Sequence, residues 1–291
     1  MENLARKLLV ALVAGMDVVK RAQLSKRSES EVKSTDATLV TETDRKSGLA
    51  MKQVLQTIPG LKLHGEDTET EVREGNQLCW FDPLDGTRAF ANGLTTSTVI
   101  IAIYDESRRR LTHVLVGEPA TGRIWEAEEG KETKLHYFPC FPNLDEEYSR
   151  FVHVWQGPVL LQSSVFIDVT HGFNRGSRQL FTDTDIAKLF GLFNGEVKLF
   201  FPGSNGLIQA LVANGGDRVA GSITTAQGGP WDVCGGLLVM QAGGAARAFR
   251  LEERKLIEGN PLDPLSFDIL VTGNSKATVD YLVGKLECVL K

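Results

Sequence analysis

The stretch that decides the fold is Leu78-Cys79-Trp80-Phe81-Asp82-Pro83-Leu84-Asp85-Gly86-Thr87. Its first four residues form an unbroken apolar run, which predicts a central strand buried on both faces. Asp82 follows the run directly, so we expect its carboxylate at the edge of the core. Taken alone, the string Asp-Pro-Leu-Asp-Gly is typical of a turn.

A short helix is predicted directly after this turn, over residues 86–92, and Gly93 ends it. The free N–H groups and the dipole at a helix N-terminus favour an anion such as phosphate. Gly86 has no side chain, and we expect this to let the backbone approach such a ligand closely.

Further acidic residues stand at the ends of predicted elements. Glu66 and Asp67 follow a strand over residues 61–64, Asp232 opens a helix beside Trp231, and Asp44 lies in the first turn of a helix. Each has a plainer explanation, because acids commonly cap helices, form turns or face water. If they converge with Asp82 and Asp85, their repulsion must be relieved by raised pKa values or by cations.

An all-oxygen cluster suits Mg²⁺ better than Zn²⁺. Next to a phosphate pocket, it indicates metal-assisted phosphoryl hydrolysis. The alternative chemistry is a pair of carboxylates acting as general acid and base, as in glycosidases. The turn suited to phosphate counts against that alternative.

The rest of the chain shows two patterns. Before residue 128, amphipathic helices near residues 4–19 and 43–58 accompany strands over 61–64, 78–81, 97–104, 111–116 and 123–127. This predicts helices packed on an antiparallel sheet. After residue 164, strands over 165–169, 197–201 and 267–271 alternate with helices over 184–193, 204–214, 232–241 and 276–290. This alternation indicates an α/β unit. Residues 130–158 show no clear period, and we place a domain junction there.

Composition argues against several classes of protein. The net charge of −5 over 291 residues is unlike that of a nucleic-acid binder with a basic surface. We interpret the basic run Arg108-Arg109-Arg110 as a hairpin turn. The apolar N-terminal segment is bracketed by charges and fits a core-packing helix rather than a signal or membrane segment. Cys79 and Cys234 are expected to be buried thiols, which suits a cytoplasmic protein.

Three strings carry a family resemblance, in this order: Gly65-Glu66-Asp67, Asp82-Pro83-Leu84-Asp85-Gly86-Thr87 and Trp231-Asp232. They resemble the inositol monophosphatase family, part of the lithium-sensitive, Mg²⁺-dependent phosphatase superfamily that includes the bisphosphate nucleotidases. The resemblance implies a mixed α+β and α/β fold, a layered αβαβα sandwich of the sugar-phosphatase type. An α+β half over residues 1–145 would supply most metal ligands, and an α/β half over residues 146–291 would supply Asp232.

The resemblance also implies roles for the matching residues. Two or three Mg²⁺ would be held by Glu66, Asp82, the Leu84 carbonyl, Asp85 and Asp232. Phosphate would be bound by Asp85 with the backbone N–H groups of Gly86 and Thr87. Glu66, Thr87 and Asp44 would be catalytic, with the Thr87–Asp44 pair orienting and deprotonating the attacking water. Asp67 would have a supporting role.

The function expected from the resemblance is hydrolysis of a small soluble phosphate ester similar to inositol monophosphate. The alternatives are a 3'(2'),5'-bisphosphate nucleotidase and a non-catalytic member that acts through a protein or RNA partner. Thr225 stands near the position of the family's acid that contacts inositol hydroxyls, which counts against inositol phosphate. Thr170-His171 is similar to a Ser-His pair of the nucleotidases. Family members are often homodimers, so a homodimer is an expectation that rests on the resemblance alone.

Overall fold

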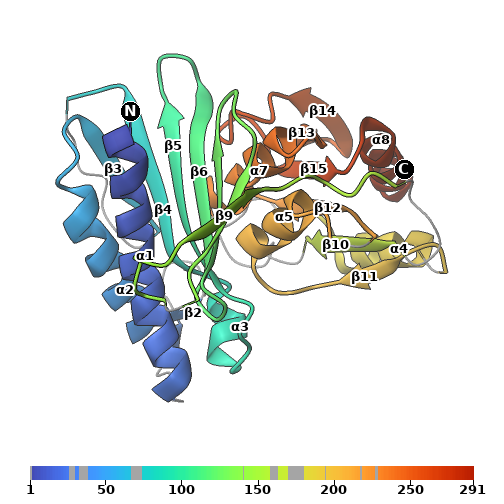
Figure 1. Ribbon diagram of the computed structural model, residues 1–291. Coiled ribbons are helices and arrows are strands. Elements are labelled where there is room, and N and C mark those ends of the chain that lie inside the picture. The colour runs from blue at the N-terminus through green and yellow to red at the C-terminus, as the bar shows by residue number, and fades with distance from the viewer. Residues whose placement is uncertain are drawn as a thin grey trace.

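The computed structural model describes residues 2–25, 30–32, 39–66, 74–139, 141–157, 163–169, 180–193, 195–216, 218–226 and 229–291. These residues form five layers in the order helix, sheet, helix, sheet, helix (Figure 1). The predicted αβαβα sandwich is therefore confirmed. The predictions for Asp67 and for Thr170-His171 lie outside the described residues.

The first layer consists of α1 (Glu2–Ser25) and α2 (Glu42–Leu55), which cover one face of the first sheet. Leu8, Leu12 and Met16 follow each other at helical spacing on α1, and all three are fully buried. This confirms the amphipathic helix predicted at the N-terminus. A short ribbon of β1 (Ser30–Val32) and β2 (Leu39–Thr41) leads into α2.

The second layer is a seven-stranded sheet in the order β3-β4-β5-β6-β7-β8-β9. Its strands are β3 (Leu61–Gly65), β4 (Gln77–Asp85), β5 (Thr98–Asp105), β6 (Arg110–Glu118), β7 (Arg123–Glu128), β8 (Lys134–Tyr137) and β9 (Tyr148–Phe151). The predicted antiparallel pairing is correct from β4 to β7 and wrong at β3, which runs parallel to β4. A tight hairpin cannot join parallel neighbours, and the long link between β3 and β4 meets that need.

Residues 130–158, which show no sequence period, contribute β8 and β9 to the first sheet. The short lengths and the exposure of all four β9 residues explain why no periodic pattern marks them. The sheet thus extends to Phe151, while the proposed division at residues 145/146 stays a prediction. The basic run has Arg108 and Arg109 in the turn between β5 and β6, as predicted, and Arg110 at the start of β6. Its arginines are also paired, Arg108 and Arg110 with Glu129 and Arg109 with Asp263.

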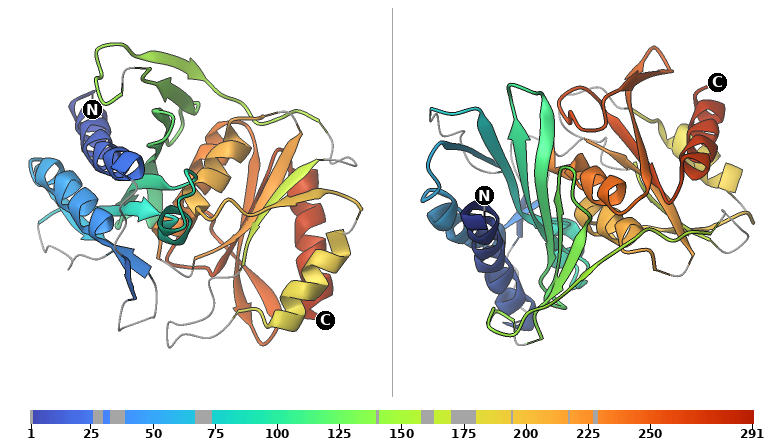
Figure 2. Two further views of the ribbon diagram at one scale, coloured as in Figure 1. Left: turned by 90° about the horizontal axis from the view of Figure 1, so that it is seen from below. Right: turned by 45° about the horizontal axis from the view of Figure 1, so that its top comes forward.

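The central layer holds α5 (Asn205–Ala213), α6 (Trp231–Cys234) and α7 (Gly236–Gln241), between the two sheets (Figure 2). The single helix predicted over residues 232–241 is therefore two helices, broken at Gly235. Gly235 lies directly against Gln209 of α5, since a Cβ built there would be 2.3 Å from Gln209 Oε1. The short helix α3 (Thr87–Ala91) follows β4.

The second sheet has the order β11-β10-β12-β15-β13-β14. Its strands are β10 (Ser164–Asp168), β11 (Lys198–Phe200), β12 (Val219–Thr225), β13 (Ala245–Glu252), β14 (Lys255–Gly259) and β15 (Ile269–Gly273). The last layer is α4 (Asp183–Phe193) with α8 (Lys276–Leu290). The sheet is mixed, because β10 runs parallel to β11 and β12, whereas β12, β15, β13 and β14 are antiparallel neighbours. The sequence patterns did not predict β12, β13 or β14.

Apolar side chains fill the spaces between the layers. Phe81 of β4 packs toward α1 and α2, and Trp80 packs on the opposite face with α5 and α7. Both side chains are almost fully buried, which confirms that β4 is covered on both faces. No helix in the described part of the chain is both long and apolar enough to cross a membrane.

Candidate active site

The candidate site begins at an irregularity in β4. Asp82 lies opposite Ile100 of β5, and Asp85 lies opposite Thr98, so β4 advances three residues where β5 advances two. Successive side chains of a regular strand alternate between faces, and residues three apart would point to opposite sides. The extra residue in this bulge places Asp82 and Asp85 on the same face.

That face looks toward the central helical layer. Ile100, the residue opposite Asp82, belongs to the core that β4 and β5 share with α5 and α7. Helix α6 brings Asp232 to the same place from the second half of the chain. The Asp232 carboxylate is oriented locally, since its Oδ2 accepts a hydrogen bond from the Gly229 N–H at 2.9 Å.

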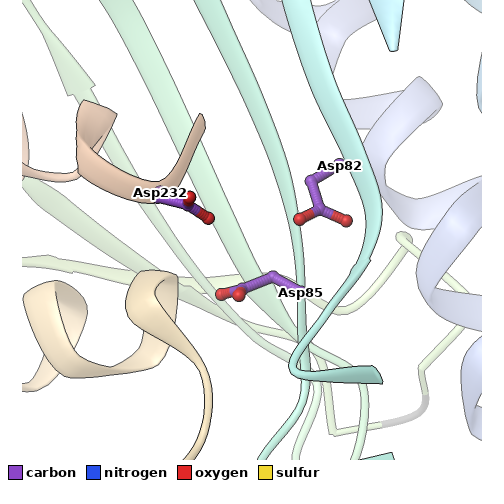
Figure 3. Close-up of side chains that lie close together, drawn as sticks. All are labelled: Asp82, Asp85 and Asp232. Atoms are coloured by element: carbon purple, nitrogen blue, oxygen red, sulfur yellow. The ribbon is translucent and has the colours of Figure 1, made fainter. Parts of the chain in front are cut away.

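The three carboxylates converge. Asp82, Asp85 and Asp232 each offer an oxygen, and these oxygens lie within 4.8 Å of one another. Figure 3 shows the three side chains pointing into the same space from β4 and α6. All three are less than 10% exposed, at 3%, 6% and 7%. This arrangement could hold a cation with oxygen ligands.

Burial and mutual repulsion make this cluster costly when it is empty and ionised. Burial raises the pKa of Asp82 well above its usual value, and the negative charges of Glu66, Asp85 and Asp232 raise it further. Glu66 is half-buried at the end of β3, and its effect on the pKa of Asp82 places its charge near the cluster. Glu66 does not belong to the group of oxygens that lie within 4.8 Å of one another.

Asp85 differs from Asp82 in its hydrogen bonds. Burial also raises the pKa of Asp85, but hydrogen bonds oppose that rise. Its Oδ2 accepts from Ser204 Oγ at 2.7 Å, from the Gly206 N–H at 2.7 Å and from Thr98 Oγ1 at 2.9 Å. Its Oδ1 accepts from the Asn205 N–H at 3.3 Å. The N-terminus of α5 therefore holds Asp85, and Oδ1 is the oxygen better placed for a further ligand.

The glycine that follows Asp85 has a packing role that the sequence pattern did not predict. Gly86 has φ of +86°, a left-handed conformation that favours glycine. A Cβ there would lie 2.6 Å from the Gly203 carbonyl oxygen and 3.1 Å from Ser204 Cβ. The space next to Gly86 Cα is therefore filled by the second half of the chain. Gly86 thus permits the two halves to meet, and the close approach of its backbone to a phosphate stays a prediction.

Asp44 and Thr87 form the predicted pair. Thr87 Oγ1 lies 2.9 Å from Asp44 Oδ1 and also 2.9 Å from the Leu84 carbonyl oxygen. A hydroxyl has one proton, so it donates to one of these acceptors at a time. The other Asp44 oxygen accepts from the N–H and the hydroxyl of Thr41, in a capping box at the start of α2. Burial raises the pKa of Asp44 despite these hydrogen bonds.

The structure adds residues that sequence reasoning did not assign to the site: Thr98, Ser204, Asn205, Gly206 and Gln209. The first four bind Asp85, and Gln209 Nε2 donates to the Asp232 carbonyl oxygen at 2.8 Å. Ser204 before an apolar helical run was a readable N-cap signal. Nothing in the local pattern identifies Asp85, 119 residues earlier in the chain, as its partner.

Comparison with known proteins agrees with this architecture. A profile of the inositol monophosphatase family matches residues 3–289, and the chain belongs to this family. The IMPase of Thermotoga maritima superposes with a TM-score of 0.73 at 19% identity, covering 99% of this chain and 100% of that one. An IMPase/NADP phosphatase in complex with NADP and Ca²⁺ gives a TM-score of 0.71 at 18% identity, covering 98% and 95% of the two chains.

A sequence relative covers a smaller region. The histidinol-phosphatase of Chlorobaculum parvum is 33% identical over 116 residues, which is 39% of this chain and 44% of that protein. The matched region thus spans less than half of either chain. The likenesses to solved structures, at these identities, describe the fold.

Proposed function

We propose that the protein is a Mg²⁺-dependent phosphomonoesterase that hydrolyses a small, soluble phosphate ester of the inositol monophosphate class. The observation that carries this proposal is the convergence of the buried carboxylates of Asp82, Asp85 and Asp232. Asp85 stands two residues before Thr87, which pairs with Asp44. Membership of the inositol monophosphatase family supports phosphatase chemistry.

The donor atoms fit a hard divalent cation. Carboxylate oxygens close together in a buried place attract Mg²⁺, which prefers oxygen ligands. Cys234 is near but unsuited as a ligand, since its thiol donates to the Trp231 carbonyl oxygen and burial raises its pKa well above the usual value. We propose the Leu84 carbonyl and Glu66 as additional ligands, as the family resemblance implies. The Ca²⁺ in the related IMPase/NADP phosphatase complex supports a divalent cation here.

The bound cations would supply positive charge that stabilises the phosphoryl and leaving oxygens. The protein's own groups hold the substrate and move the proton. The N–H groups of Gly86 and Thr87 lie at the start of α3, where no acceptor exists within the helix, and they would donate to phosphoryl oxygens. Glu66, half-buried near Asp82, would help to hold the attacking water.

The proton path runs through the hydroxyl of Thr87. When this hydroxyl donates to Asp44 Oδ1, its lone pairs are free to accept a hydrogen bond from the attacking water. The water would pass its proton to Thr87 Oγ1 while the Thr87 hydroxyl proton passes to Asp44. The raised pKa of Asp44 makes it a stronger base for the proton that Thr87 passes on. While Thr87 donates to Asp44, the Leu84 carbonyl accepts no hydrogen bond from this hydroxyl and would be available to hold a cation.

A second candidate substrate follows from the sequence relative. The histidinol-phosphatase match favours an amino-alcohol phosphate such as histidinol phosphate. Thr225 weakens the case for inositol recognition at its position, since it is buried and its hydroxyl donates to the Asp168 carbonyl at 3.4 Å. Bisphosphate nucleotides are the third candidate class of substrate. The complete set of acids, with Thr87, counts against a non-catalytic role.

Phosphate release from a substrate panel tests the proposal. The panel contains inositol monophosphates, L-histidinol phosphate, adenosine 3',5'-bisphosphate, NADP and fructose 1,6-bisphosphate, each with Mg²⁺ and with EDTA. We expect release that requires Mg²⁺, fastest with one monoester class. If no member of the panel releases phosphate with Mg²⁺, the phosphatase function is rejected. If release persists in EDTA, the requirement for a metal ion is rejected.

Three smaller expectations accompany this function. Cys79, Cys234 and Cys288 are free thiols, which supports a reducing compartment such as the cytoplasm. Lithium is expected to inhibit the enzyme, as the family resemblance implies, and inhibition of phosphate release by LiCl but not by equal KCl tests this. A homodimer is likewise proposed from the resemblance, and light scattering would measure it.

A further inference from the structure

Helix α5 touches carboxylates that come from both halves of the chain. At its N-terminus, Ser204 Oγ and the Gly206 N–H hold Asp85 of β4, each at 2.7 Å. About one turn further along the helix, Gln209 reaches the start of α6, which carries Asp232. The same rigid element therefore contacts two of the three converging aspartates.

Gln209 is an unusual side chain for its surroundings. It is fully buried, between the core of the central layer and β12. Its Nε2 donates to the Asp232 carbonyl oxygen at 2.8 Å and to Thr224 Oγ1 at 3.2 Å. Among the described residues its Oε1 has no hydrogen-bond partner, and it lies against Gly235, at the break between α6 and α7. An amide buried with an unsatisfied oxygen is unfavourable, so packing alone does not account for glutamine here.

The donor of Gln209 meets a specific need of α6. This helix has only four residues, and the last four carbonyl groups of a helix accept no hydrogen bond from within it. The Asp232 carbonyl is one of these groups, and Gln209 satisfies it from the neighbouring helix. The Asp232 backbone is thereby fixed to α5, while its side chain faces Asp82 and Asp85 (Figure 3).

We propose that Gln209 is a positioning residue for the cation site, which it serves by anchoring the Asp232 backbone at a fixed distance from Asp85. The three carboxylates repel each other when ionised, and a four-residue helix has little rigidity of its own to resist that repulsion. The Gln209 contact resists it, so the ligands are held in place before a cation binds. This inference rests on the proposed metal-dependent function.

The test measures Mg²⁺ binding by isothermal titration calorimetry, in the absence of substrate. Gln209→Met keeps the length of the side chain and removes the donor. Gln209→Glu keeps its shape and replaces the donor by an acceptor. We expect both variants to bind Mg²⁺ about tenfold or more weakly than the wild type, the range seen when groups that support metal ligands are removed.

Two control variants separate positioning from general stability. Thr224→Val removes the other acceptor of the Gln209 amide and leaves the contact with Asp232. Ser222→Ala removes a buried hydroxyl pair with Thr272, 2.7 Å long, on the same strand β12. Both controls should bind Mg²⁺ within about twofold of the wild type, far less than the loss expected for a group that supports a metal ligand, even if their Tm falls in EDTA.

The outcomes are distinct. Unchanged Mg²⁺ affinity in either Gln209 variant that folds overturns the positioning role alone. Equal losses in the Gln209 variants and in Ser222→Ala also overturn it, because they would indicate a general effect on stability. A wild type that binds no Mg²⁺ removes the proposed metal site, and the role of Gln209 falls with it.

Discussion

Two polar clusters lie on opposite faces of the first sheet, and they differ in how their charges are arranged. The acidic cluster of Asp82, Asp85 and Asp232 places like charges together. The other cluster, which we call the His–Glu chain, consists of His113, Glu126, His136 and Glu147. There His113 Nε2 lies 2.7 Å from Glu126 Oε1, His136 Nε2 lies 2.9 Å from Glu126 Oε2, and His136 Nδ1 lies 2.6 Å from Glu147 Oε1.

The pKa shifts follow this difference. Burial opposes ionisation of Glu126, but the hydrogen bonds and charges of His113 and His136 outweigh it and lower the pKa of Glu126 far below its usual value. Burial likewise opposes the charge on His136, but Glu126 and Glu147 outweigh it and raise its pKa. In the acidic cluster the pKa of Asp82 rises instead. We therefore expect the His–Glu chain to stabilise the fold, and the acidic cluster to be destabilised by a repulsion that a cation would relieve.

The largest expected effect distinguishes the clusters by activity. Asp82→Asn removes a charge from the centre of the acidic cluster, and we expect turnover to fall by about 10³-fold or more. Glu126→Gln, in the His–Glu chain, should keep turnover within about threefold, since it touches no group of the candidate site. Steady-state phosphate release by both variants measures this. Wild-type turnover by Asp82→Asn would contradict the assignment of the metal ligands.

The next effect concerns stability of the His–Glu chain. Glu126→Gln removes the charge shared by the two histidines, and hydrogen bonds to charged groups contribute about 1.5–3 kcal/mol each. We expect the free energy of unfolding to fall by about 2–3 kcal/mol. Urea denaturation at pH 6 measures it, with Glu128→Gln on the same strand as the control. A loss no greater than that of the control would show that the chain of hydrogen bonds does not stabilise the fold.

The acidic cluster should respond with the opposite sign. In EDTA at pH 8, Asp82→Asn relieves repulsion and burial of a charge, so the free energy of unfolding should rise by about 1–2 kcal/mol. The folded pKa of Asp82 lies above its unfolded value, so this gain should shrink as the pH falls through the raised pKa and the wild-type carboxyl becomes protonated. A variant less stable than the wild type in EDTA would contradict stored repulsion.

The smallest expected effect is a pH profile. The pKa of His136 is raised in the folded protein, so its contribution to stability is complete below about pH 6.5 and is lost as the pH rises through the folded pKa. The contribution of Glu126, whose folded pKa is lowered, is complete above its unfolded pKa of about 4.3 and is lost as the pH falls.

The stability difference between wild type and His136→Gln should therefore be largest near pH 5–6, at about 1 kcal/mol. It should narrow toward both acid and alkaline pH. Thermal unfolding at intervals from pH 4 to pH 9 measures the difference. A difference that is flat across this range would indicate that the histidine is held by packing rather than by charge.

The elements with strong local patterns could be predicted from the sequence. The apolar spacing of α1 identified a helix, the run before Asp82 a buried strand, and the alternation after residue 164 an α/β unit. The layered order of the whole fold came from the family resemblance. The β8 and β9 strands could not be predicted in this way, since they are short and β9 is exposed along its whole length. The parallel direction of β3 relative to β4 could not be predicted either, because no residue pattern within the two strands determines it.

The acids of the candidate site could be named from motifs, but their arrangement depends on contacts between distant segments. The bulge between Asp82 and Asp85 is defined by its pairing with β5, which no property of the Asp-Pro-Leu-Asp string alone reveals. The hydrogen bonds from α5 to Asp85 and to the Asp232 backbone cross the two halves. The packing of Gly86 against Gly203 of the other half is likewise a contact between distant segments, and no local pattern reveals it.

The close approach of Gly86 to Gly203 has a consequence for engineering. Both residues have positive φ, +86° and +80°, and a Cβ on Gly86 would collide with the Gly203 carbonyl oxygen of the other half. A methyl group at residue 86 would push β4 away from the start of α5. This would separate the two halves of the chain at the place where Asp82 and Asp85 meet Asp232. Alanine at this position offers a way to weaken cation binding without removing a single ligand.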